Sequence, residues 1–148
     1  MKAINFEAKQ VIKQLIAFLK ENDLGDNSAI LNNSNGAFME VHISRRPDAE
    51  NRDIINYFRV RNILPAVYSL AHYYELNGDL MNDPMMEFLE GVDGEFYPIS
   101  FRQDSIGYDK QVLVFDAQGK CNYYYNEQAG QAEFANEWLR NIKLQQNL

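Results

Sequence analysis

The sequence predicts an α+β domain, in which an antiparallel β-sheet meander has the N-terminal and C-terminal helices packed on one face. Three observations lead to this prediction. Helical periodicity lies at the two ends of the chain, residues 66–125 alternate like strands, and tight-turn residues divide those strands at short intervals. Short, regular turns favour antiparallel hairpins over crossover connections.

Size and composition agree with this prediction. The 148 residues, 46% apolar and 13% aromatic, can form the core of one domain, which we expect to span residues 1–148. One cysteine and two histidines exclude an internal disulfide framework and the usual closed zinc site, so we expect no metal and no cofactor. Because no apolar run resembles a signal peptide or a membrane span, we expect a cytoplasmic protein.

The first half of the chain predicts a helix and two strands. Residues 3–22 repeat apolar residues at helical spacing, with a basic stripe on the opposite side made by Lys2, Lys9, Lys13 and Lys20. Residues 37–44 alternate, with Ala37, Met39, Val41 and Ile43 on one side and Phe38, Glu40, His42 and Ser44 on the other. Ile54, Phe58 and Val60 suggest another strand, and a short helix from Asp48 is the alternative.

The second half predicts a meander. Residues 66–76 fit either a strand or a helix behind Pro65, and we favour the strand because aromatic residues alternate there and Asn77-Gly78 is a strong hairpin signal. Strands are then expected at 85–90, 95–102, 110–116 and 120–125, with turns at Asp93-Gly94 and Gln118-Gly119 and a loop at 103–109. A final helix from about Gly130 should bury Trp138 against the sheet, leaving the outer sheet face exposed.

Few residues suggest chemistry. His72 has the right ordinary pKa for acid/base work, but it shares a predicted strand face with Tyr68 and Leu70, which favours a packed structural histidine. Asp79 and Asp83 flank a turn, and two carboxylates are too few for a calcium or tight magnesium site. Turn formation also explains them, as it explains Asp93, Asp104 and Asp109.

Nucleotide and nucleic-acid binding have little support. The glycines are scattered at turns and form no phosphate-binding loop, and Cys121 alternates with tyrosines on a strand, as a buried thiol would. Tyr73 and Tyr124 belong to an aromatic excess that could stack bases. Such platforms need a positive groove, whereas the strands from residue 85 onward are acidic, so packing explains these rings better.

Three segments carry a family resemblance. They are HYYELNGDLMNDPMMEF at 72–88, YPISFRQDSIGYDKQVLVFD at 97–116 and FANEWLRNIKLQQ at 134–146. The chain resembles, mainly over residues 68–146, an uncharacterised family of small bacterial proteins encoded on plasmids and conjugative elements. The resemblance implies an accessory role in a mobile genetic element and carries no known activity.

These observations favour a non-enzymatic, protein-binding accessory module. The net charge of −7 is uneven, since residues 1–62 carry nine Lys/Arg against eight Asp/Glu and residues 63–148 carry five against thirteen. We therefore expect a basic protein partner, with Asp79, Asp83, Asp104 and Asp109 as candidate binding residues and His72, Tyr73 and Tyr124 as further candidates. The alternatives are an acidic mimic or inhibitor of a nucleic-acid enzyme and a hydrolase that uses Asp79, Asp83, Asp104 and His72.

Overall fold

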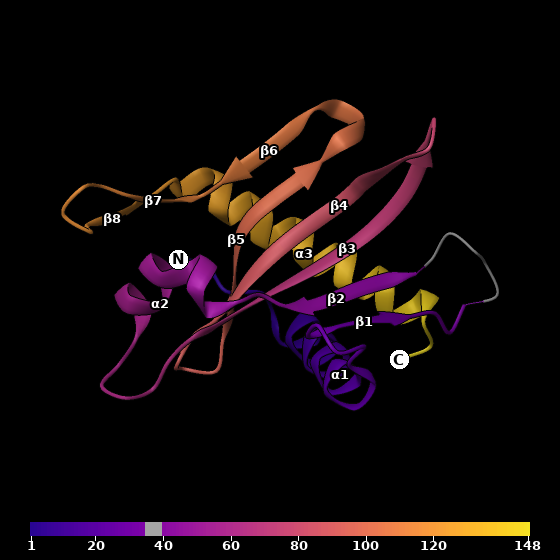
Figure 1. Ribbon diagram of the computed structural model, residues 1–148, viewed down its shortest axis with the longest axis horizontal. Helices are drawn as coiled ribbons and strands as arrows, with labels where there is room; N and C mark the ends of the chain where they lie inside the picture. Colours follow the sequence, from indigo (N-terminus) through magenta and orange to yellow (C-terminus); the bar gives the residue numbers. More distant parts are fainter. Residues whose placement is uncertain (35–39) are drawn as a thin grey trace.

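A computed structural model describes residues 1–34 and 40–148 of the chain (Figure 1). The helices are α1 (Phe6–Asn22), α2 (Arg52–Phe58) and α3 (Tyr125–Gln145), with 3-10 turns η1 (Asp48–Asn51) and η2 (Asp104–Ile106). The strands are β1 (Ser28–Leu31), β2 (Val41–Arg45), β3 (Ala66–Leu76), β4 (Asp79–Glu90), β5 (Phe96–Gln103), β6 (Tyr108–Gln111), β7 (Leu113–Phe115) and β8 (Cys121–Tyr123).

Within the described residues, β1 to β6 form one antiparallel sheet in sequence order, and β7 and β8 form a separate two-stranded hairpin. Each strand pairs with the next along the chain, as the predicted meander requires. Asn77 and Gly78, which connect β3 to β4, both have positive φ, at 53° and 84°. This is the backbone conformation of a type I′ turn, so both the strand over 66–76 and its hairpin are confirmed.

The two long helices cover one face of the sheet, as predicted. Figure 1 shows α3 running behind the strands, with α1 below it. The Asn5 side chain caps α1 by accepting a hydrogen bond from the Ala8 backbone N–H at 2.9 Å. The main core joins Leu15 of α1 and Leu139 of α3 to Phe88 of the sheet, and Trp138 is buried with them as expected.

The opposite, outer face of the sheet is covered at one end only. A second cluster of buried apolar residues lies there, made by Val67, Leu89, Ile99 and Val112. Ile54 and Phe58 of the η1–α2 segment pack against it. Figure 1 shows α2 and the β7–β8 hairpin at this end, while the tips of the β3–β4 and β5–β6 hairpins extend the other way. The outer face at those tips is the exposed sheet face that the sequence predicts.

The strand predicted around residues 54–60 is wrong. The chain there forms η1 and then α2, which was the alternative considered. Ile54, Ile55 and Phe58 stand at helical spacing, so that Ile55 is buried while Ile54 and Phe58 reach the second cluster. The apparent alternation of Ile54, Phe58 and Val60 arose because two of these residues are four apart, a spacing that fits both periods.

Other differences concern boundaries. β1 was not predicted, since its four residues lie within a turn-rich stretch. Ala37, Phe38 and Met39 of the predicted 37–44 strand lie outside the described residues, and β2 begins at Val41. α3 begins at Tyr125 rather than near Gly130. The strand predicted at 110–116 divides at Val112, whose N–H bonds to Ile99 of β5 while its carbonyl accepts from Tyr124.

A candidate binding face on the open side of the sheet

A row of polar side chains crosses the outer face of the sheet. Cross-strand register places one residue from each of the six strands in it: Ser28, Ser44, Ser69, Glu87, Ser100 and Gln111. The hydroxyls of Ser44 and Ser69 lie 2.6 Å apart, and Ser100 donates to Glu87 at 2.9 Å. Ser69 and Ser100 are buried, so these bonds satisfy groups that would otherwise be costly to bury. The row separates the covered end of the face from the open end.

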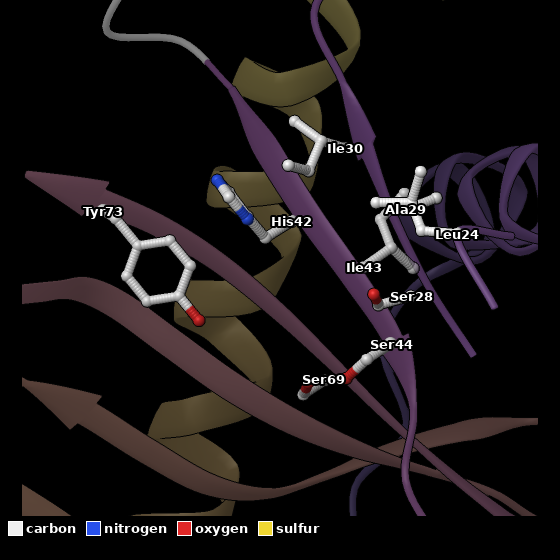
Figure 2. A pocket seen from close by; sticks show the side chains of 9 residues that line it. All are labelled: Leu24, Ser28, Ala29, Ile30, His42, Ile43, Ser44, Ser69 and Tyr73. Atoms are coloured by element: carbon white, nitrogen blue, oxygen red, sulfur yellow. Dashed lines mark hydrogen bonds between the residues drawn. The ribbon is translucent and has the colours of Figure 1, made fainter. Parts of the chain in front are cut away.

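The open end begins one level beyond this row. Direct cross-strand partners there are Ile30, His42, Ala71, Met85, Arg102 and Asp109. Figure 2 shows Tyr73 and His42 in front of the strands, with α3 behind. Their rings meet edge to face with centroids 4.6 Å apart, beside a hollow of about 210 Å³ that Ser44 and Ser69 also line. The open end thus combines an aromatic centre with polar groups.

Charge at the open end is mixed. Burial lowers the pKa of His42 and outweighs the opposing effect of Glu40, whose carboxylate lies 3.5 Å from Nε2. His42 is therefore mainly neutral at pH 7. Burial also raises the pKa of Tyr73, although the positive charges of Arg46 and Arg102 oppose that shift. A tyrosine hydroxyl near two guanidinium groups can donate to a ligand and can also accept from it.

Asp104 is bound within the chain. Its carboxylate accepts from Arg102 Nε at 2.8 Å, from the Asn82 backbone N–H at 2.7 Å and from the Asn82 side chain at 3.2 Å. The bond from Arg102, followed by the backbone bond from Asn82, lowers the pKa of Asp104. Asp109 lies opposite Arg102 across β5 and β6 and is exposed. These two predicted residues therefore flank one arginine at the open end.

The other two candidate aspartates lie elsewhere. Asp79 is the exposed first residue of β4, and four residues of extended strand, about 13 Å, separate it from Asp83. Asp83 accepts from the Gln103 side chain at 2.8 Å. A single small ion or reacting group cannot contact both carboxylates at that separation. In the described part of the chain, no three His, Cys, Asp or Glu side chains are arranged to hold a metal ion.

His72 faces the helices. Its Nδ1 accepts a hydrogen bond from Trp138 Nε1 at 3.4 Å, and the two rings meet edge to face with centroids 5.4 Å apart. Among the described residues its buried Nε2 has no hydrogen-bond partner. Burial lowers the pKa of His72, His42 lowers it further, and Asp83 opposes both. This environment is that of a histidine packed against Trp138.

A second hollow lies at the covered end and is lined by aromatic side chains. It has a volume of about 500 Å³ and is lined by Met1, Tyr57, Phe58, Arg59, Val60, Leu89, Gly91, Val92, Asp93, Tyr97, Cys121 and Tyr123. Tyr97 donates to Asp93, and burial together with this bond raises the pKa of Tyr97 to about 12. Burial raises the pKa of Cys121, so its thiol is protonated at neutral pH. This hollow can hold a small apolar molecule.

Tyr124 belongs to neither region. It is exposed, precedes α3 and has the Lys110 ammonium 3.8 Å above its ring, a cation–π contact within the chain. The polar row and the aromatic hollow were both missed from the sequence. Serines within strands, such as Ser69 between Tyr68 and Leu70, were the sequence signal for the polar row. They can be recognised as a row only once the register of the strands is known.

Comparisons with known proteins add one finding about identity. Within the described residues, no helix has the length and apolar character that crossing a bilayer requires. Neither the curated proteins nor the solved structures gave a significant match to the chain. A family model described as a domain of unknown function (DUF6908) matches residues 10–148. The chain therefore belongs to the DUF6908 family, an uncharacterised domain family.

Proposed function

We propose that the protein is a non-enzymatic binding module whose partner is a protein that docks on the open end of the outer sheet face. The observation that carries the proposal is the composition of this uncovered surface. Tyr73, Met85 and Arg102 lie on neighbouring strands there, and tyrosine, methionine and arginine are the types enriched at protein interfaces. His42 extends the aromatic centre toward β1.

The partner that fits this face is basic. The Asp109 side chain is exposed on this face and makes no hydrogen bond or ion pair with the described residues, whereas Asp79 is exposed but pairs with Leu76 on the helix-facing side of the β3–β4 tip. Asp109 supports the proposal as an exposed negative charge beside Arg102 that can attract a cationic partner. Asp83 accepts from Gln103, and Asp104 accepts from Asn82 and Arg102. These two aspartates support the proposal by fixing the positions of neighbouring strands at the open end. The chain charge of −7 favours the same association at low salt.

The resemblance to plasmid-encoded and conjugative-element proteins is the support for an accessory role in a mobile element. A mimic or inhibitor of a nucleic-acid enzyme is the nearest alternative, and it would require carboxylates spaced like phosphates. The hydrolase alternative loses support, because Asp79 is about 13 Å from Asp83 along β4 and His72 faces the helices.

A second candidate function is the binding of a small apolar molecule in the aromatic hollow. Its volume of about 500 Å³ and its four aromatic rings favour this use. Titration with the neutral dye N-phenyl-1-naphthylamine tests it. The dye should bind the wild-type protein, and Val60→Asp, which charges an exposed side chain of the hollow, should weaken that binding. Equal binding by both proteins would exclude the hollow as the dye site.

Affinity capture combined with surface variants tests the leading proposal. The tagged wild-type protein and the variants Tyr73→Ala and Arg102→Ala are used to capture proteins from the organism that encodes the chain. Phe6→Ala and Lys13→Ala, two exposed positions of α1, serve as matched controls. A protein retained by the wild type and by both controls, but lost or strongly reduced with Tyr73→Ala, is the predicted result. Circular dichroism should show all variants folded, and a partner lost only with the α1 variants would overturn the proposal.

A further inference from the structure

An apolar groove lies away from the candidate binding face, between α3 and the β5–β6 end of the sheet. It has a volume of about 330 Å³, and its lining residues are Phe101, Ile106, Tyr108, Glu127, Gly130, Gln131 and Phe134. The Phe101 ring lies 4.9 Å from that of Phe134 and 5.8 Å from that of Tyr108, measured between centroids. Ile106 is 69% exposed. Three aromatic rings and an exposed isoleucine thus surround a hollow that no described part of the chain fills.

Gly130 has no packing reason to be a glycine. It lies inside α3, where glycine is less favourable than alanine because it loses more backbone freedom on folding. A Cβ added at Gly130 would meet no atom within 4 Å. Packing within the described chain would therefore allow an alanine at this position. The absence of a side chain there keeps space open in the wall of the groove.

Gln131 lines the same groove and carries an unsatisfied acceptor that is buried behind its wall. The residue is 6% exposed, and its Nε2 donates to the Lys110 carbonyl at 3.3 Å, which identifies the other amide atom as the oxygen. Within the described residues, that Oε1 is buried and has no hydrogen-bond partner. A buried acceptor without a donor is costly, so a ligand that supplies a donor gains from satisfying it.

From these features we propose that the groove binds the indole of a tryptophan on a protein partner. The ring packs among Phe101, Tyr108 and Phe134, in the space beside Gly130. Its N–H donates to Gln131 Oε1 once the amide turns toward the ring, a movement that gives up the 3.3 Å bond from Nε2 to the Lys110 carbonyl. Indole fits because it is aromatic and its one polar group only donates. Phenylalanine has no donor, and a tyrosine hydroxyl would bring an acceptor into the apolar groove.

The rim of the groove selects the residues beside the tryptophan. Glu127 lines the groove and makes no ion pair with the described residues, so a lysine or arginine next to the tryptophan would be favoured. Tryptophan anchors seated in pockets commonly supply much of the energy of a protein interface. This site is independent of the outer sheet face, which lies on the other side of the sheet.

Two matched peptides test the proposal by NMR. The first is Ac-Lys-Trp-Lys-NH2, and the second has 1-methyltryptophan in place of tryptophan, which replaces the N–H donor by a methyl group. With the ¹⁵N-labelled wild-type protein, the first peptide should shift the signals of Gly130, Tyr108 and the Gln131 side-chain amide. The methylated peptide should bind about three- to tenfold more weakly, the value of one net hydrogen bond.

Protein variants identify which group is responsible. Gln131→Leu should erase the difference between the two peptides, whereas Gln14→Leu, at an exposed glutamine of α1, should preserve it. Gly130→Ala should raise the thermal unfolding midpoint and at the same time weaken binding, two effects that a purely structural role of the glycine would not combine. Equal affinity of the two peptides for the wild type, or shifts confined to other parts of the chain, would overturn the proposal. So would binding of free indole without binding of the peptide, which would indicate a small-molecule site.

Discussion

Replacing Trp138 by alanine tests the packing of α3 on the sheet. Trp138 is 6% exposed and lies against His72 and Phe134, with ring centroids 5.4 Å and 6.3 Å away. Burying an aromatic side chain removes about 150–250 Å² from water, which at ~25 cal/mol per Å² is worth roughly 4–6 kcal/mol. Alanine keeps a small part of that contact, so the expected loss in the free energy of unfolding is about 3–5 kcal/mol.

The assay is urea unfolding followed by far-ultraviolet circular dichroism, because Trp138 is the one tryptophan of the chain and its fluorescence is lost with it. A loss of this size should lower the thermal midpoint by roughly 6–20 °C. Trp138→Phe keeps a ring but removes the donor to His72, and should cost about 1–2 kcal/mol. Phe6→Ala, at a position 76% exposed, is the control and should change stability by less than about 0.5 kcal/mol. A loss below about 1 kcal/mol for Trp138→Ala would refute the packing described for α3.

Three further predictions concern stability. Folding lowers the pKa of His72, so the contribution of His72 to the free energy of unfolding is complete above its ordinary pKa of 6.5 and is lost as the pH falls through the folded pKa. The variant His72→Gln should therefore show a smaller decline of urea stability between about pH 7 and 5, and the decline that remains is due to His42. Gly78→Val places a β-branched residue at a φ of 84° and should cost roughly 1–3 kcal/mol in chemical denaturation; a variant as stable as the parent would contradict the turn geometry. Gln128, buried, bonds both backbone groups of Lys2 at 2.7 and 2.8 Å, so Gln128→Leu should cost about 1–3 kcal/mol and speed amide exchange at Lys2.

Local signals predicted much of the fold. Asn77-Gly78 adopts positive φ in a two-residue turn, so this dipeptide alone identified the central hairpin and decided between strand and helix for residues 66–76. α1 followed from apolar residues that face the core at helical spacing. In both cases the physical cause lies within a few residues of sequence, which is why a single sequence contains enough information.

Nonlocal contacts account for what could not be predicted. β1 is a strand because Ala29 pairs with Ile43 across a connection that its own residues do not reveal. α2 is a helix because Phe58 packs on the covered end of the outer face, a surface that exists only after the sheet forms. Likewise, Ser69 and Glu87 become neighbours only through the register of β3 and β4. The sequence predicted an exposed sheet face and candidate residues such as Tyr73, but not the register that brings them together.

Site-specific photo-crosslinking tests the central claim, that a protein partner docks on the open end of the outer sheet face, most directly. p-Benzoylphenylalanine is placed at Tyr73 or Met85 on that face, and at Lys13 on α1 as the control, and each protein is irradiated in the living cells that encode the chain. The account predicts that the same partner is cross-linked from Tyr73 and from Met85, and that it is not cross-linked from Lys13. A partner cross-linked from Lys13 and from neither position on the sheet would contradict it.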